Sequence, residues 1–355
     1  MKKTKQRLVL NLALLLAALI LSIGISEGVL RALGISPKVI LLTSTNFESA
    51  YMRSLNPLLG YELKPNYRSN SPTNHFGSFS YVNSDGQRDI EREISRTGGR
   101  RRVILLGDSV VAGHGQPDLN LTISRTMEKI LADGTEVLNF GVGGYTTIGE
   151  VELLRTKGLK YKPDAVLLIH VDNDFRNRNG DMRPYPVNRP KWVEALFLHS
   201  DLFRLTSIQL DLYGFGRDFH GSWLDQHKHA IRDSSVEEAI ETLKELAVEN
   251  NFQLGVAIWP RFGDEYISNW RHEKVGSTQE LKIMAILSKL KIPMIDLQKI
   301  LEGDWKSRCK KTSCPNPRLL YSAGGDRIHP NTLAAEVTAH ALIPFLGDLM
   351  SKSYE

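Results

Sequence analysis

Two apolar patterns divide the chain. Residues 8–25 carry no charge, and as a helix rising ~1.5 Å per residue they span ~27 Å, close to the thickness of a bilayer core. From about residue 100 onward, short continuous apolar runs alternate with longer amphipathic segments. The first pattern predicts a membrane-spanning helix, and the second predicts an α/β domain.

Five apolar runs without polar alternation predict strands that are buried on both faces of a sheet. They are residues 103–106, 137–140, 165–171, 254–258 and 293–297. Amphipathic segments predict helices over residues 121–131, 148–159, 236–249, 278–290 and 333–350. Because strands and helices alternate, and crossovers are right-handed, we expect a five-stranded parallel sheet in a three-layer α/β/α sandwich.

The chain is predicted to have three parts. Residues 1–26 form a basic tip and a transmembrane signal anchor, residues 27–99 a stem that packs on the main domain, and residues 100–355 that domain, with an insertion at about 175–234. The positive-inside tendency keeps the basic tip in the cytoplasm, which puts the main domain in the periplasm or outside the cell. The alternative is a cleaved signal peptide, with Ser22, Gly24 and Ser26 as the small residues near its cleavage site.

Composition and charge narrow the function classes. Of the 355 residues, 41% are hydrophobic and 24% are charged, which is typical of a globular protein and not of a disordered or polytopic membrane protein. The formal net charge is +5, but Lys2, Lys3, Lys5 and Arg7 supply four of these charges. The rest of the chain is therefore close to neutral, and we expect no nucleic-acid partner.

The two cysteines, Cys309 and Cys314, lie in one loop-like stretch. In an exported chain the compartment is oxidising, so this spacing favours a short-range disulfide that closes the loop. Two free thiols are the alternative. A zinc site would need further ligands nearby, and the surrounding sequence offers none.

Polar residues follow three of the predicted strands and precede the last helix. These segments are Gly107-Asp108-Ser109, residues 139–144 (Asn-Phe-Gly-Val-Gly-Gly), Asp172-Asn173-Asp174 and residues 326–331 (Asp-Arg-Ile-His-Pro-Asn). Taken singly, each is explained as a turn or a helix cap. Because sites in parallel sheets form beyond the carboxyl ends of the strands, we expect the four segments to meet in one cleft.

Together the segments contain the parts of a serine hydrolase. The hydroxyl of Ser109 is a poor nucleophile unless a base takes its proton, and His329 can be that base. Asp326, three residues earlier, is placed to orient the imidazole and stabilise its cationic form. The oxyanion of a tetrahedral intermediate needs hydrogen-bond donors, and the backbone N–H groups of Ser109 and Gly144 with the side-chain amide of Asn173 fit that need.

The four segments, in this order, resemble the four sequence blocks of the SGNH or GDSL-like hydrolases over roughly residues 100–350. The resemblance implies an SGNH, flavodoxin-like fold, with Ser109 as nucleophile, Gly144 and Asn173 in the oxyanion hole, His329 as base and Asp326 as its partner. It implies an esterase, lipase, thioesterase or carbohydrate acetylesterase that needs no metal or cofactor. Two positions depart from the family pattern: Val110 replaces a common leucine, and Val171 replaces a glycine, where a Cβ would displace the Asn173 amide.

Other polar residues near the predicted cleft are candidates for substrate binding. They are Asp108, His114 and Asp174, with helix capping or loop packing as the alternative. His170 lies inside an apolar strand, which favours a hydrogen-bonded core histidine. His227 and His229 share a spacing that some metal sites use, but their charged neighbours favour an exposed polar stretch.

The insertion at about 175–234 is too long for an ordinary strand-to-helix connection. It combines several arginines with aromatic residues that include Trp192 and Trp223. Aromatic faces stack on sugars or cover acyl chains, so we expect this segment to fold over the cleft, with Trp192 and Trp223 binding substrate. The alternative is a packed helical hairpin whose aromatic residues form a core.

The sequence therefore predicts a membrane-anchored serine esterase outside the cytoplasm that acts on an acylated carbohydrate or another ester. An acyl group such as acetate on a cell-envelope or exported polysaccharide is the expected substrate. An O-acyltransferase, a lipase or lysophospholipase, and a non-catalytic carbohydrate-binding protein on a hydrolase scaffold are the alternatives.

Overall fold

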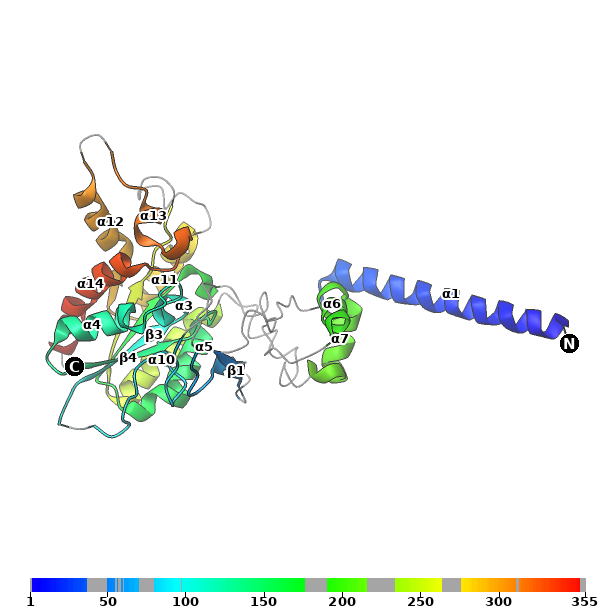
Figure 1. Ribbon diagram of the computed structural model, residues 1–355, viewed down its shortest axis with the longest axis horizontal. Coiled ribbons are helices and arrows are strands. Elements are labelled where there is room, and N and C mark those ends of the chain that lie inside the picture. The colour runs from blue at the N-terminus through cyan, green and yellow to red at the C-terminus, as the bar shows by residue number, and fades with distance from the viewer. Residues whose placement is uncertain are drawn as a thin grey trace.

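A five-stranded parallel sheet forms the centre of the globular body of the computed structural model (Figure 1). The strands lie in the order β4-β3-β5-β6-β7 and are β3 (Arg102–Gly107), β4 (Glu136–Gly141), β5 (Ala165–His170), β6 (Gln253–Ile258) and β7 (Met294–Asp296). Each corresponds to one of the five predicted runs, so the predicted sheet is confirmed. The structure describes residues 2–36, 50–54, 56, 59, 61–69, 80–96, 98–175, 190–215, 234–263, 276–310 and 313–351.

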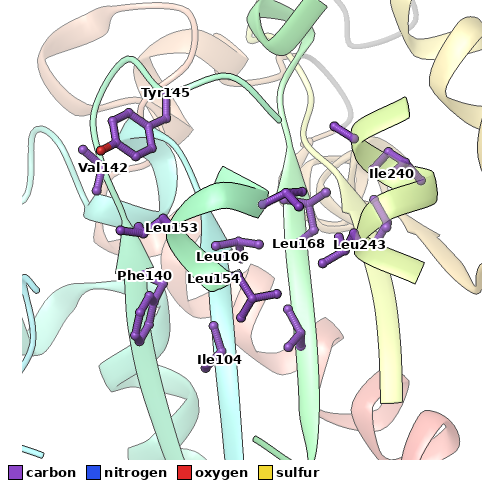
Figure 2. Packing of buried hydrophobic residues seen from close by; sticks show 14 of the residues in the cluster. Ile104, Leu106, Phe140, Val142, Tyr145, Leu153, Leu154, Leu168, Ile240 and Leu243 are labelled. Atoms are coloured by element: carbon purple, nitrogen blue, oxygen red, sulfur yellow. The ribbon is translucent and has the colours of Figure 1, made fainter. Parts of the chain in front are cut away.

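Successive residues of the strands point into two hydrophobic cores, one on each face of the sheet. In β3, Ile104 and Leu106 belong to the first core, and Val103 and Leu105 belong to the second. Helices α5 (Thr147–Leu153), α10 (Ser234–Asn250) and α11 (Gly276–Lys289) complete the first core, part of which Figure 2 shows. Helices α4 (Ile123–Leu131), α12 (Leu297–Arg308), α13 (Pro317–Tyr321) and α14 (Thr332–Ser351) complete the second. This burial on both faces explains the absence of polar alternation and confirms the three-layer sandwich.

Several helix boundaries differ from the prediction. The helix expected over residues 148–159 is α5 followed by a π-helical turn, Leu154–Gly158, and a 3-10 turn, Leu159–Tyr161. The expected strand 293–297 ends at Asp296, whose side chain caps α12 by accepting the Gln298 N–H at 3.1 Å. Further 3-10 turns lie at Leu119–Leu121, Asp172–Phe175, Leu212–Gly214 and Ala323–Gly325. Cys309 and Cys314 form a disulfide in the loop between α12 and α13, with their Cα atoms 4.3 Å apart.

The N-terminal apolar run lies in a single helix, α1 (Lys2–Leu33). Its segment Val9–Leu33 is a candidate membrane span, whose most apolar 18 residues have a mean hydropathy of 2.5 and are not buried. Among the described helices α14 also reaches the required length and hydropathy, but it packs against α4 and α12 in the second core. We therefore assign α14 to the sheet domain and treat α1 as the candidate span.

The described residues between 50 and 96 pack on the sheet domain. Strands β1 (Tyr51–Arg53) and β2 (Tyr61–Leu63) form an antiparallel pair, and Tyr51, Tyr61, Leu63 and Val82 are buried in the first core. The Arg88 guanidinium is buried as well and donates to the carbonyl oxygens of Ala112, Gly113 and Gln116 in the loop after Ser109. This part of the predicted stem therefore supports the loop that follows the candidate nucleophile.

The described part of the predicted insertion is a helical pair, α6 (Lys191–His199) and α7 (Asp201–Gln209). The pair has its own small core of Val193, Phe197, Ile208 and Phe215, and it packs on the carboxyl-terminal end of α1 (Figure 1). The expectation that this segment covers the cleft is corrected for residues 190–215, because contacts with α1 determine where they lie. The packed hairpin with an aromatic core, the alternative interpretation, describes these residues.

Candidate active site

The candidate nucleophile stands on a tight turn between a strand and a short helix. Strand β3 ends at Gly107, and Ser109 begins α3 (Ser109–Ala112). The buried Asp108 carboxylate caps this helix, since its Oδ1 accepts the Val110 N–H at 2.8 Å. The turn therefore fixes the Ser109 backbone, and the Ser109 side chain lies just beyond the carboxyl end of β3.

Ser109, His329 and Asp326 form a continuous chain of hydrogen bonds. The Ser109 Oγ is 2.8 Å from His329 Nε2, and His329 Nδ1 is 2.5 Å from Asp326 Oδ2. If Nδ1–H donates to the carboxylate, Nε2 is left to accept the proton of the serine hydroxyl. The fold therefore brings Ser109 and His329, which are 220 positions apart in the chain, into direct contact.

The Asp326 carboxylate is held in its ionised form. Burial raises its pKa. The hydrogen bond and charge of His329 lower the pKa, as do the N–H groups of Ile328 and His329, which donate to the carboxylate at 2.8 and 2.9 Å, and together they outweigh burial. The net shift is downward, so the group is negative at neutral pH. One carboxylate oxygen is thus used to shape the turn, and the other faces the imidazole.

Four hydrogen bonds from outside the turn hold the His329 segment in place. Trp259 Nε1 donates to the Ile328 carbonyl at 2.7 Å, the Phe262 N–H to Arg327 at 2.8 Å, the Ala323 N–H to His329 at 2.8 Å, and Gln116 Nε2 to Pro330 at 2.9 Å. Trp259 and Phe262 follow β6, and Gln116 follows α3. The imidazole is therefore positioned by the same strand ends that surround the serine.

The second sequence block joins the end of β4 to the nucleophile helix. Asn139 Nδ2 donates to the Val111 carbonyl at 2.9 Å, and its Oδ1 accepts the Gly141 N–H at 2.9 Å. A Cβ on Gly141 would lie 2.1 Å from the Ala112 backbone nitrogen, so only glycine fits. Gly144, the expected oxyanion donor, has a φ of +78°, in the left-handed region that favours glycine. The sequence places Asn139 in the block, but its role in holding α3 becomes visible only in the structure.

Asn173, the third expected oxyanion donor, lies beside the nucleophile turn. Its Nδ2 donates to Asp108 Oδ2 at 3.1 Å, and the Ser109 Oγ is 3.3 Å from the same oxygen. Val171, at the position where a glycine was expected, is buried and packs in the second core. Its side chain is therefore accommodated away from the Asn173 amide, which still reaches Asp108.

His114 lies next to the histidine of the hydrogen-bonded chain. The two rings are stacked with centroids 5.7 Å apart, and His114 Nε2 is 3.2 Å from the Tyr51 hydroxyl. A Cβ on Gly143 would lie 2.4 Å from the His114 ring, so this glycine makes room for the stack. Tyr51 was not among the candidate residues, because nothing in the sequence near it indicates a contact with a loop that follows β3.

Two of the candidate substrate-binding acids are buried. Asp108 caps α3, and Asp174 Oδ2 accepts the Val171 N–H at 2.9 Å and lies 3.0 Å from His170 Nδ1. Burial raises the pKa of both carboxyls, more strongly than their hydrogen bonds and the charge of the neighbouring histidine lower it. These contacts favour capping and loop packing over contact with substrate.

A third buried acid, Glu150, was missed from the sequence. It lies on α5, and neither of its carboxylate oxygens has a hydrogen-bond partner among the residues that the structure describes. Burial, with the nearby charges of Asp174 and Asp108, raises its pKa well above the usual value. On an amphipathic segment a glutamate is indistinguishable from a surface residue, so the sequence carries no signal for its burial.

The remaining candidates lie elsewhere. Trp192 is on α6, in edge-to-face contact with Tyr213, and with residues 190–215 it belongs to the pair on α1, which corrects its expected place at the cleft. Trp223, His227 and His229 lie outside the described residues. Within the described part of the chain, no three His, Cys, Asp or Glu side chains are grouped so that they could hold a metal ion.

Comparison of the chain with protein-family models and with curated proteins finds no match. Solved structures that are similar to it have names of the esterase and acylhydrolase class. A carbohydrate acetylesterase family member from Sinorhizobium meliloti has 13% identity, with 71% of this chain and 100% of that chain covered, at a TM-score of 0.40. A member of the lipolytic protein G-D-S-L family from Veillonella parvula has 14% identity, with 70% of this chain and 100% of that chain covered, at a TM-score of 0.42. An acetyl xylan esterase has 15% identity, with 69% of this chain and 99% of that chain covered, at a TM-score of 0.44.

Proposed function

We propose that this chain is a membrane-anchored serine esterase of the SGNH type that removes an acyl group, such as acetate, from a cell-envelope or exported polysaccharide. The observation that carries the proposal is the chain of hydrogen bonds from Ser109 through His329 to Asp326, with distances of 2.8 and 2.5 Å. The positive charges at the start of α1, before the candidate span, favour a cytoplasmic N-terminus and a sheet domain in the periplasm or outside the cell.

The acylation step follows from the positions of three side chains. The Ser109 Oγ attacks the ester carbonyl carbon while its proton passes to His329 Nε2, and Asp326 stabilises the imidazolium. The carbonyl oxygen becomes an oxyanion, for which the Ser109 and Gly144 N–H groups and the Asn173 amide are the proposed donors. The intermediate then collapses, the bond to the alcohol oxygen breaks, and that oxygen takes the proton from Nε2.

The second step regenerates the enzyme with the same groups. A water molecule attacks the acyl-Ser109 carbonyl and gives its proton to His329, and collapse releases the carboxylic acid as the Oγ recovers the proton. Each proposed oxyanion donor contributes about 3–4 kcal/mol of transition-state stabilisation. The proposed function therefore depends on groups that the chain supplies beyond the carboxyl ends of the parallel strands.

The polysaccharide is a proposal of its own and rests on location. A catalytic domain held outside the membrane meets cell-envelope and exported glycans, and acyl esters of such glycans are substrates that the proposed triad can cleave. Long-chain esters would be met at the membrane surface, so faster turnover of long-chain than of acetyl esters would favour a lipase or lysophospholipase.

The test uses the full chain in detergent micelles and a chromogenic acetyl ester. We expect ester cleavage by the native chain, a loss on the order of 10⁴–10⁶-fold in kcat for Ser109→Ala, and labelling of Ser109 by a fluorophosphonate. A folded native chain that neither cleaves activated esters nor reacts with the probe would contradict the proposal. An added oligosaccharide acceptor distinguishes acyl transfer from hydrolysis, because transfer yields an acylated sugar in place of free acid.

A further inference from the structure

The helical pair α6–α7 is fastened to the end of the candidate membrane span. The Glu27 carboxylate of α1 accepts hydrogen bonds from the N–H groups of Asp201 and Leu202, at 3.0 and 2.9 Å, and from the Ser200 hydroxyl at 2.9 Å. A single side chain of α1 therefore caps the first turn of α7. Arg31, one turn further along α1, donates to the His199 carbonyl at 2.5 Å.

The pair is a folded unit with its own buried hydrogen bonds and ring contacts. Arg204 is buried and donates to the Phe197 carbonyl at 2.9 Å and to Ser36 Oγ at 3.1 Å, and it forms an ion pair with Asp201 at 3.0 Å. The rings of Phe197 and Phe215 stack with centroids 3.6 Å apart. The core and the contact with α1 thus define the buried side of residues 190–215.

The exposed surface of residues 190–215 is unusually apolar. Trp192, Leu196, Leu210, Leu212 and Tyr213 have exposed fractions of 56, 43, 68, 38 and 48%. All other described residues from position 50 onward contribute only the same number of exposed large hydrophobic side chains. An apolar surface of this density, within 26 residues, is typical of a surface that another apolar phase covers.

The position of the unit along α1 indicates which phase that is. A bilayer core takes about 20 helical residues, so a span that begins at Val9 leaves the hydrocarbon near residue 28, at the level of Glu27. Tryptophan and tyrosine are enriched at this level of membrane proteins because an apolar ring with one polar edge suits the boundary. The apolar surface therefore continues, at the membrane boundary, the apolar surface of α1.

We propose that residues 190–215 form a membrane-interface unit, in which Trp192, Leu196, Leu210, Leu212 and Tyr213 lie in the headgroup region of the leaflet from which α1 emerges. The inference rests on the proposed anchoring by α1 and not on the esterase activity. The chain then reaches the membrane at α1 and again at α6–α7. The unit carries two positive side chains, Lys191 and Arg204, and three negative ones, Glu194, Asp201 and Asp211. Apolar burial, and not attraction to anionic headgroups, therefore holds the unit at the membrane.

The test places a spin label at exposed positions of the full chain in nanodiscs of neutral phosphatidylcholine. Leu196→Cys and Leu210→Cys report on the unit, Leu16→Cys on α1 serves as the lipid control, and Leu319→Cys, which is 66% exposed on α13, serves as the water control. The native cysteines are paired and do not take the label. The readout is collision of the label with oxygen, which concentrates in lipid, and with a water-soluble nickel chelate.

We expect the oxygen-to-nickel collision ratio at positions 196 and 210 to exceed that at position 319 several-fold and to stay below that at position 16, which lies deeper in the bilayer. Addition of anionic lipid should leave the ratio unchanged. A ratio equal to that at position 319 would overturn the proposal, and so would exclusion of both reagents, which means coverage by protein such as a second copy of the chain. A water-like ratio at position 16 would overturn it together with the anchoring by α1, whereas a loss of ester cleavage alone would bear only on the proposed function.

Discussion

At the scale of single residues, the two carboxylate oxygens of each of two aspartates in the site bind different groups. Asp326 orients His329 with one oxygen and shapes the turn with the other, and the Asp108 carboxylate holds both the Val110 N–H and the Asn173 amide. Rigid positions follow, because a group held from two sides has little freedom to rotate. Such preorganised donors are what electrostatic stabilisation of a developing charge requires.

Asn173 allows a test of that arrangement. We expect Asn173→Ala to lower kcat for an acetyl ester by on the order of 10²–10³-fold with a small change in KM, because an oxyanion donor acts on the transition state and not on the bound ester. Steady-state kinetics with thermal unfolding of the same variant checks this. If KM rises and kcat is retained, Asn173 is a substrate contact and not an oxyanion donor.

Glu150 gives a prediction about stability and pH. Its pKa is raised in the folded protein, so folding takes up a proton, and the favourable contribution is present below pH 4.5 and is lost as the pH rises through the folded pKa. Between pH 4.5 and the folded pKa, the ionisation of this group lowers the free energy of unfolding by about 1.4 kcal/mol for each unit of rising pH. We expect Glu150→Gln to be more stable than the native chain at pH 7.5 and about equal to it near pH 4.5, measured by urea unfolding.

Glu152 is the matched control for Glu150, two positions along the same helix. Burial raises its pKa, but the hydrogen bonds from Arg155 and Asn56 outweigh this, so the net shift is downward. Its contribution is therefore present above pH 4.5 and is lost as the pH falls through the folded pKa. Glu152→Gln should be less stable than the native chain at pH 7.5, and the same sign for both variants would contradict the assignment of Glu150.

At the scale of elements, the site depends on how closely α3 approaches β4. Gly141→Ala would place a Cβ 2.1 Å from the Ala112 backbone nitrogen, and a backbone atom cannot move aside as a flexible side chain can. We expect this variant to lose about 2–4 kcal/mol of stability and most of its ester cleavage. The control is Gly303→Ala, an exposed position inside α12 with open space around it, which should gain about 1 kcal/mol. Equal stability of the two variants by urea unfolding would contradict the close approach.

Four of the five strands were predictable because they are buried on both faces, which leaves a continuous apolar run, whereas β7 is a partly exposed edge strand. α12 was missed because the predicted strand ends at its first residue, Leu297, whereas Asp296 both ends the strand and caps the helix. The candidate residues at the strand ends follow from the rule for parallel sheets. The contact of Tyr51 with His114 and that of Glu27 with α7 join segments distant in sequence, and no local pattern records such pairs.

At the scale of the whole molecule, the described residues between 50 and 96 are an integral part of the sheet domain. Arg88 is buried among the carbonyl groups of the loop after Ser109, and Asp89 and Arg92 form a buried ion pair that Glu128 of α4 extends. Removal of this segment takes Arg88 from the carbonyl groups of Ala112 and Gln116 and takes Asp89 from the Asn139 N–H. Buried polar groups that lose their partners cost several kcal/mol beyond the lost apolar burial.

Truncation tests this dependence with two fragments that differ only in the segment. We expect a fragment of residues 50–355 to unfold cooperatively and to keep the ester cleavage of the full chain, since β1, β2 and Arg88 are retained. A fragment of residues 100–355 should lack a cooperative transition in thermal unfolding, because Tyr51, Tyr61 and Val82 no longer fill the first core. The shorter fragment retains every residue of the proposed triad, so its inactivity would show that the triad requires the preceding segment. A stable, active fragment beginning at residue 100 would show instead that residues 50–96 are an accessory to a domain complete without them.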